Sequence, residues 1–242
     1  MVQPRHGDLP PRTPLLEGLL LVHKPPGLTS HDVVDIVRRK LAIRRIGHTG
    51  TLDPMAEGLL ILLIGAATKR QQSFQTHSKL YEATLQLGTQ TDTGDAMGVV
   101  VRTASVPALA RDHIVEVLRS FNGRHMQTPP TYSAVKVRGR PAYYWARRQT
   151  PVTLAPRPIQ LSDMTLMDCG SSTFTFRVQC SAGTYIRTVA EAIAERLGTV
   201  GHLARLTRLH VGAWTLDQAR SLAWINDASA EQIIREVRPC GL

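Results

Sequence analysis

A run of ten mostly apolar residues, 58–67 (GLLILLIGAA), constrains the fold of this chain most strongly. A membrane-spanning helix needs roughly 20 apolar residues, so this run is too short to cross a bilayer. Its length predicts a buried strand instead. A chain of 242 residues with 43% hydrophobic residues can bury a core around such a strand, in one or two domains.

The rest of the pattern predicts a mixture of strands and helices. Helices are expected from a Ser30 N-cap to Leu41, and over 66–77, 107–119 and 184–197, the last stopped by Gly198. Further strands are expected at 18–24, 79–87, 159–168 and 173–180, and near Trp214. No repeat or linker divides the chain, so one α+β domain over 17–242 is predicted, after a loose tail at 1–16.

Charge and cysteine content narrow the function classes. Lys+Arg 29 against Asp+Glu 19 gives a formal charge of +10, which attracts a polyanion and makes nucleic acid the leading partner. Anionic membranes and phosphorylated substrates fit the same balance. Three cysteines without a C-x-x-C pair predict neither a disulfide framework nor a zinc knuckle, and imply a reduced compartment. The nine histidines show no metal-ligand spacing and no phosphate-binding or dinucleotide loop occurs, so metal, ATP and nicotinamide chemistry are not expected.

One glycine-rich segment, 44–58, shows no regular hydrophobic periodicity, which predicts a loop leading into the buried strand. Such a loop is a suitable place for a functional site. Asp53 in it can serve as a nucleophile or general base, although Asp-Pro is also a common turn. His48 can be a general base or a surface hydrogen-bonding residue. Tyr81 shares a strand face with Ala83 and Leu85, so core packing is its alternative role.

Basic residues mark two other places. Arg187, at the start of helix 184–197, lies at the positive end of the helix dipole, so it needs a nearby anion, either Asp53 or a phosphate. Segment 132–148 interleaves cations with Tyr and Trp, a pattern that binds looped RNA by charge and stacking. On a helix the same aromatic residues can equally form a core.

Seven segments spread over 17–214 resemble the TruB family of tRNA pseudouridine synthases; single segments are weak signals, but the seven together are highly specific. They are GHTGTLDPMAEGLL (47–60), LLLVHKPPGLTS (19–30), SKLYEA (78–83), QTDTGD (90–95), PPTYSAVK (129–136), GTYIR (183–187) and LTRL (206–209). The resemblance implies a pseudouridine synthase fold: a mixed, mainly antiparallel sheet flanked by helices around a central RNA-binding cleft. It also implies an isomerase that converts uridine 55 in the T loop of tRNA to pseudouridine without metal or cofactor.

The resemblance further assigns roles to residues. Asp53 matches the catalytic aspartate, Tyr81 the tyrosine that stacks on the target base and handles the C5 proton, and Arg187 the basic partner of the aspartate. RNA contacts are implied for the matching pocket, loop and insertion residues His48, Tyr185, Leu206, Lys24, Lys69, Lys136, Arg138 and Arg140. His48 matches the residue that fills the space left by the flipped uridine.

The implied partner is the T stem-loop of tRNA, bound by a cytoplasmic monomer through an RNA-gripping insertion at about 124–152. The chain ends 28 residues after Trp214, so the small C-terminal PUA domain of many relatives is not expected. A role in tRNA folding, beside catalysis or instead of it, is the alternative function.

Overall fold

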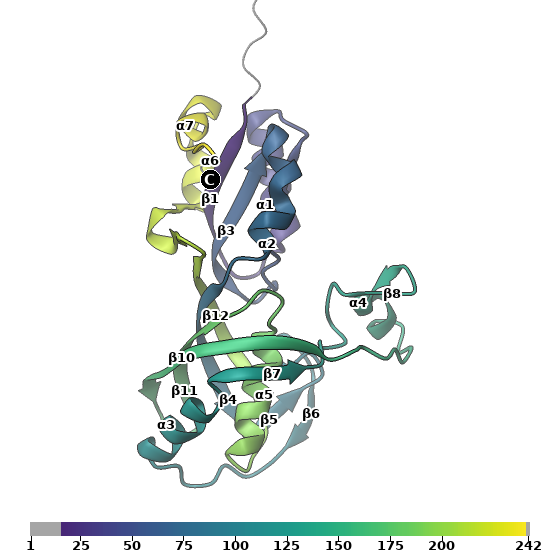
Figure 1. The fold of residues 1–242 in the computed structure, drawn as a ribbon, viewed down its shortest axis with the longest axis vertical. Coiled ribbons are helices and arrows are strands. Elements are labelled where there is room, and N and C mark those ends of the chain that lie inside the picture. Colours follow the sequence, from purple (N-terminus) through teal and green to yellow (C-terminus); the bar gives the residue numbers. More distant parts are fainter. Residues whose placement is uncertain (1–15, 241–242) are drawn as a thin grey trace, which may run out of the picture.

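A sheet of ten strands runs through the protein (Figure 1). The structure is a computed structural model that describes residues 16–240, so the predicted tail lies almost wholly outside the described residues. The strand order is β14-β1-β3-β12-β4-β11-β10-β7, with β2 on β3 and β13 on β12. The strands are β1 (Gly18–Lys24), β2 (Ile46–His48), β3 (Glu57–Ile64), β4 (Lys79–Leu87), β7 (Gly123–Gln127), β10 (Arg157–Cys169), β11 (Thr173–Cys180), β12 (Gly201–Val211), β13 (Trp214–Thr215) and β14 (Arg220–Ser221).

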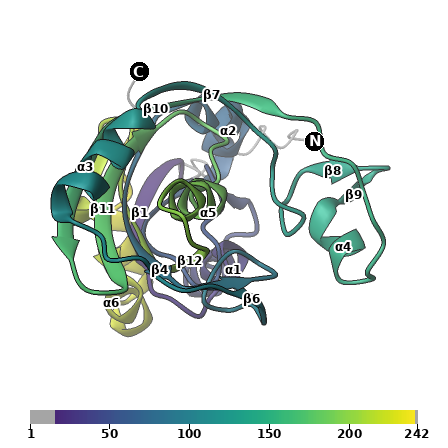
Figure 2. The ribbon, with the colours of Figure 1, turned by 90° about the horizontal axis from the view of Figure 1, so that it is seen from below.

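Helices cover the two halves of this sheet. Near β1 and β3, α1 packs against α6 and α7, whereas α5 packs on β12 and β4 with α3 beside it. Figure 2 shows the strands curving around α5. The helices are α1 (Ser30–Leu41), α2 (Gln71–Gln75), α3 (Arg111–Ser120), α4 (Ala142–Ala146), α5 (Ile186–Arg196), α6 (Leu222–Asp227) and α7 (Ala230–Arg235), with 3-10 segments η1 (Gly65–Arg70) and η2 (Leu216–Gln218).

Strand β3 is the predicted buried strand, and both of its faces are covered. Leu60, Leu62 and Ile64 belong to the larger core cluster, whereas the alternate residues face a smaller cluster on the other side. Strand β12 pairs with β3 in parallel, inside a sheet whose other long pairings are antiparallel. The predicted α+β class and the mainly antiparallel sheet are therefore confirmed.

Three local predictions were wrong. Thr29, not Ser30, caps α1, because Asp32 completes a capping box with Thr29: each side chain bonds the other residue's backbone N–H. Segment 44–58 is not all loop, since β2 pairs with β3. Residues 66–77 do not form one helix but divide into η1 and α2.

A lobe leaves the sheet between β7 and β10 and stands away from the main body (Figures 1 and 2). It holds the hairpin of β8 (Lys136–Val137) and β9 (Arg140–Pro141) followed by α4. Another hairpin, β5 (Thr89–Thr91) with β6 (Val100–Thr103), lies beside β12. The lobe spans 128–156, whereas the sequence predicted an insertion at 124–152, because β7 already belongs to the sheet.

No helix among residues 16–240 is long and apolar enough to span a bilayer. The cysteines Cys169, Cys180 and Cys240 are free thiols.

Candidate active site

An ion pair between Asp53 and Arg187 forms the centre of the site. Asp53 lies in the loop between β2 and β3, and Arg187 in the first turn of α5. The Nε atom of Arg187 donates to Oδ2 of Asp53 at 2.8 Å. The arginine side chain is 4% exposed and the aspartate side chain 32%, so the cation is buried while one side of the carboxylate remains open. Of the two anions expected beside Arg187, Asp53 is therefore present.

The same guanidinium contacts two further segments of the chain. Its Nη1 donates to Thr93 O at 2.7 Å and its Nη2 to Tyr132 O at 2.9 Å. Asp95, the last residue of the segment QTDTGD, places Oδ2 3.7 Å from Nε. Asp95 also holds a turn, since its Oδ1 accepts from Thr93 Oγ1 and the Met97 N–H. Its burial is the feature that sequence reasoning missed.

Lys24 contacts the loop that carries Asp53 from the interior of the protein. Its side chain is fully buried, and its Nζ donates to Leu28 O at 2.6 Å, Pro25 O at 2.9 Å and Pro54 O at 3.4 Å. Burial lowers the pKa of Lys24 to about 8. The expectation that Lys24 contacts RNA directly is at odds with this position, because its ammonium already faces three carbonyl groups away from solvent.

Tyr81 and Leu206 lie buried on neighbouring strands, β4 and β12. Burial raises the pKa of Tyr81, and the nearby negative charge of Asp53 acts in the same direction. Tyr185 precedes α5, where its backbone N–H and C=O bond the side chain of Gln127, and burial raises its pKa too. Both phenols are therefore neutral at physiological pH.

His48 and Lys69 occupy contrasting positions. His48 lies on β2, where burial lowers its pKa, and its Nδ1 is buried without a hydrogen-bond partner in the described part of the chain. Lys69 is exposed on η1. A neutral imidazole with an unused ring nitrogen is suited to contact an uncharged group.

The lobe carries the remaining predicted RNA-binding cations, Lys136, Arg138 and Arg140, all exposed. They do not lie beside Asp53; Arg138 and Arg140 lie over aromatic rings of α4 instead. Arg148 lies 3.8 Å from the ring centroid of Tyr144, with Arg140 at 5.5 Å from the same ring. Trp145 donates Nε1 to Val137 O at 3.0 Å. Tyr144 and Trp145 are thus half-buried beneath these arginines, whereas Tyr143 is exposed.

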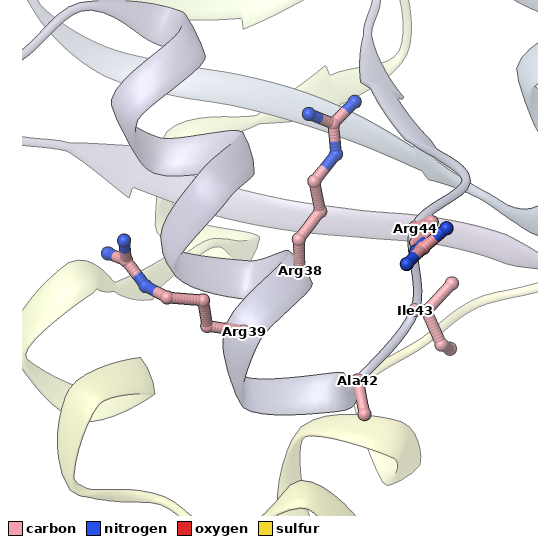
Figure 3. Close-up of a pocket in the computed structure, with 5 residues that line it drawn as sticks. All are labelled: Arg38, Arg39, Ala42, Ile43 and Arg44. Atoms are coloured by element: carbon pink, nitrogen blue, oxygen red, sulfur yellow. The ribbon is translucent and has the colours of Figure 1, made fainter.

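A pocket of about 380 Å³ lies elsewhere, at the C-terminal end of α1 (Figure 3). Arg38, Arg39 and Arg44 line it together with Ala42 and Ile43. It is distant from the loop that carries Asp53, because that loop contacts the opposite end of α1 through Ser30 and Leu52. No group of three or more His, Cys, Asp or Glu side chains within residues 16–240 is placed to hold a metal.

The comparisons with known proteins all indicate the same family. The model of the TruB family pseudouridylate synthase N-terminal domain matches residues 38–186. The tRNA pseudouridine synthase B of Opitutus terrae is 44% identical over 239 residues, covering 99% of this chain and 96% of the relative. The enzyme of the same name from Burkholderia lata is 46% identical over 220 residues, covering 90% and 68%.

Solved structures share the fold. A Cbf5-Nop10-Gar1 complex contains a chain that aligns with a TM-score of 0.70 and 26% identity, over 92% of this chain and 60% of that one. The archaeal box H/ACA sRNP Nop10-Cbf5 complex aligns with a TM-score of 0.68 and 25% identity, over 99% and 66%. This chain thus spans about two thirds or less of those chains. The predicted pseudouridine synthase fold is confirmed.

Proposed function

The chain belongs to the TruB family of pseudouridylate synthases, and we propose that its substrate is the T-loop uridine at position 55 of tRNA. The observation that carries this proposal is the ion pair of Asp53 with the buried Arg187, at 2.8 Å. It places a carboxylate with one open side in a cation-lined site, at the motif position of the family's catalytic aspartate. The product is an isomer of the substrate, so the reaction consumes no oxidant, reductant or co-substrate.

The reaction breaks the N1–C1′ bond of the uridine and forms a C5–C1′ bond after the base has turned. The C5 proton is lost and N1 gains a proton, so atoms and charge balance. Asp53 acts as the nucleophile, on the base or on the sugar, and Arg187 supplies its counter-charge. Tyr81 stacks on the base. Because its phenol is neutral, it takes up the C5 proton only as a relay, passing its own hydroxyl proton on to water in the same step.

The remaining residues bind and hold RNA. Leu206 and Tyr185 form the wall of the pocket, and the neutral His48 occupies the space of the flipped nucleotide. Extruding a base costs a few kcal/mol, which such contacts offset. Lys69 and the lobe cations Lys136, Arg138 and Arg140 bind phosphates, so residues 128–156 act as the RNA-gripping insertion.

We also propose that the protein works as a monomer in the cytoplasm, where tRNA is modified. Light scattering on the free protein and on its complex with a T-arm hairpin tests the monomer: one chain per RNA is expected, and two would contradict it. An additional tRNA-folding role predicts that a catalytically inactive variant still accelerates refolding of an unmodified tRNA.

The central experiment uses a T-arm hairpin that carries tritium at uridine C5. Because C5 loses its hydrogen in the reaction, the protein should release tritium from that single uridine and yield pseudouridine of unchanged mass. Asp53→Asn is the matched control and should release none. Tight RNA binding without tritium release by the wild type would overturn the enzymatic function and favour the RNA-folding alternative.

A further inference from the structure

Arg208, on β12, carries a buried positive charge with no acidic partner. It is 1% exposed, and none of the ion pairs in the described chain includes it. A buried cation is costly unless hydrogen bonds replace its hydration. Three backbone carbonyls do so: Nε donates to Leu59 O at 2.7 Å, Nη2 to Gly50 O at 3.1 Å and Nη1 to Thr51 O at 3.3 Å.

Two of these carbonyls belong to the loop that carries Asp53. Gly50 and Thr51 come just before Asp53 in the chain, so the guanidinium of Arg208 holds the loop backbone while Arg187 holds the carboxylate. The planar guanidinium can donate in several directions at once, which a lysine ammonium at the end of a flexible stem does not reproduce.

The backbone of Arg208 is fixed as closely as its side chain. In the sheet it is the register partner of Gly58 on β3 and of Tyr81 on β4. Gly58 has φ of +111°, and a Cβ there would lie 2.4 Å from Arg208 O, so only glycine permits this approach. Arg208 is thus in contact with the strand after the Asp53 loop and beside the strand of Tyr81.

We propose that Arg208 is a positioning residue for the isomerisation, which holds the loop bearing Asp53 in register with the strand bearing Tyr81. This inference rests on the proposed function, because it takes Asp53 and Tyr81 as the reacting groups. Misplacing a catalytic group by about 1 Å can cost on the order of a hundredfold in rate. Loss of the Arg208 bonds therefore slows the chemical step and spares RNA binding, which depends on exposed cations elsewhere.

The charge of Arg208 has a second effect on the same site. It opposes the rise that burial causes in the pKa of Tyr81, whereas Asp53 and Cys180 raise that pKa further. It also lowers the pKa of its neighbours Lys24 and Lys79. Removing the charge should therefore raise the pKa of Tyr81.

The test compares Arg208→Lys and Arg208→Gln with a control, Ile225→Ala. Ile225 is a fully buried residue of α6, so its truncation destabilises the protein without touching the catalytic loop. In single-turnover reactions on the T-arm hairpin, Arg208→Lys should be at least about tenfold slower with Kd within about threefold of wild type. Ile225→Ala, at a similar loss of Tm, should keep the wild-type rate. A rate for Arg208→Lys within about threefold of wild type would overturn the positioning role.

Two readouts do not require activity. Hydrogen exchange at the Thr51 and Leu52 amides should be faster in both Arg208 variants than in Ile225→Ala. The Tyr81 phenol, followed by ¹³Cζ NMR and assigned with Tyr81→Phe, should titrate at higher pH in Arg208→Gln. If the wild type makes no pseudouridine, the proposed function fails while these readouts still decide the role of Arg208. Unchanged exchange rates at these two amides in the Arg208 variants would overturn the positioning role. If Arg208→Gln does not fold, the exchange rates of Arg208→Lys decide the question.

Discussion

Asp53 and Asp95 lie beside one guanidinium, with their Oδ2 atoms 2.8 Å and 3.7 Å from Nε of Arg187. The two carboxylates differ in what else they do. The side chain of Asp95 is 8% exposed and its Oδ1 accepts two hydrogen bonds from its own turn, whereas Asp53 keeps an open side. Asp95 therefore fixes the arginine, and Asp53 is the carboxylate free to react.

Asp53→Asn should abolish pseudouridine formation and leave tRNA affinity within a few-fold, because the amide lacks the reactive charge while binding relies on distant cations. Glu57→Gln is the control, since it removes the charge of another carboxylate near the same loop and should keep activity. The rate is measured by product formation, and affinity by filter binding. Turnover of Asp53→Asn above roughly a thousandth of wild type would rule out the nucleophile assignment.

Asp95→Asn should slow catalysis by about tenfold or more with unchanged RNA affinity, because Arg187 loses its second counter-charge in a buried setting. The amide retains an acceptor oxygen for the turn. Asp92→Asn provides the comparison, since Asp92 is exposed and accepts only from Val99 N–H in the same hairpin. An equal loss in both variants would mean that hairpin folding, not the charge beside Arg187, causes the effect.

Tyr81→Phe should bind RNA normally but turn over slowly, because stacking survives and the hydroxyl is lost. Since burial raises the pKa of Tyr81 above its usual 10.0, the phenol stays protonated up to that pH. The single-turnover rate of the wild type should accordingly show no Tyr81 ionisation between pH 6 and 9. A phenylalanine variant as fast as wild type would leave Tyr81 with packing alone.

Lys79 should make stability depend on pH. It is buried with Nζ donating to Gln75 O and His77 O, and burial lowers its pKa from 10.5 to about 8. Between pH 8 and 10.5 the unfolded chain binds a proton that the native state has released, so this residue's contribution to the unfolding free energy rises with pH. Below pH 8 its burial penalty remains in full.

Urea denaturation checks this prediction. The unfolding free energy of wild type minus that of Lys79→Met should increase from pH 7.5 to 9.5. The same difference for Lys69→Met, which alters an exposed lysine, should stay flat. A flat difference for Lys79→Met as well would contradict the lowered pKa.

Binding should weaken steeply with salt, and the lobe should account for part of the slope. Replacing Lys136, Arg138 and Arg140 together by alanine should reduce the slope of log K against log salt by roughly two to three, because each phosphate contact releases counterions. The saturated single-turnover rate should stay near wild type. Alanine at the exposed Arg111, Arg119 and Arg235, distant from the lobe, is the charge-matched control. Equal slopes for the two triple variants would remove the lobe from the RNA interface.

Periodic segments could be predicted from the sequence, and short ones could not. The alternation in β4 and the apolar face of α5 gave those elements nearly to the residue, because side-chain period directly reflects burial. Strand β2 has three residues, too few to show any period, and exists only through its pairing with β3. Thr29 and Ser30 are equally good caps by type, and only the position of Asp32 distinguishes them.

The residues of the site also divide into those that the sequence could predict and those that it could not. Family motifs pointed to Asp53, Arg187 and Tyr81, whereas the roles of Lys24 and Arg208 depend on burial that charge alone does not predict. The expectation that Lys24 contacts RNA comes from its place in the family-like segment 19–30, and a motif does not show whether a side chain is buried. The signal for Arg208 was its inward position, two residues after Leu206 on an alternating strand.

The position of β12 between β3 and β4 also bears on how the protein is made. A ribosome releases β3 and β4 long before residues 201–211, so both strands are made well before the strand that they share as a neighbour. During that interval, edges of a very apolar strand are open to wrong pairing. Because Arg208 arrives with β12, a nascent or truncated chain that stops before residue 208 lacks the hydrogen bonds that hold the Asp53 loop, and catalytic competence requires synthesis through β12.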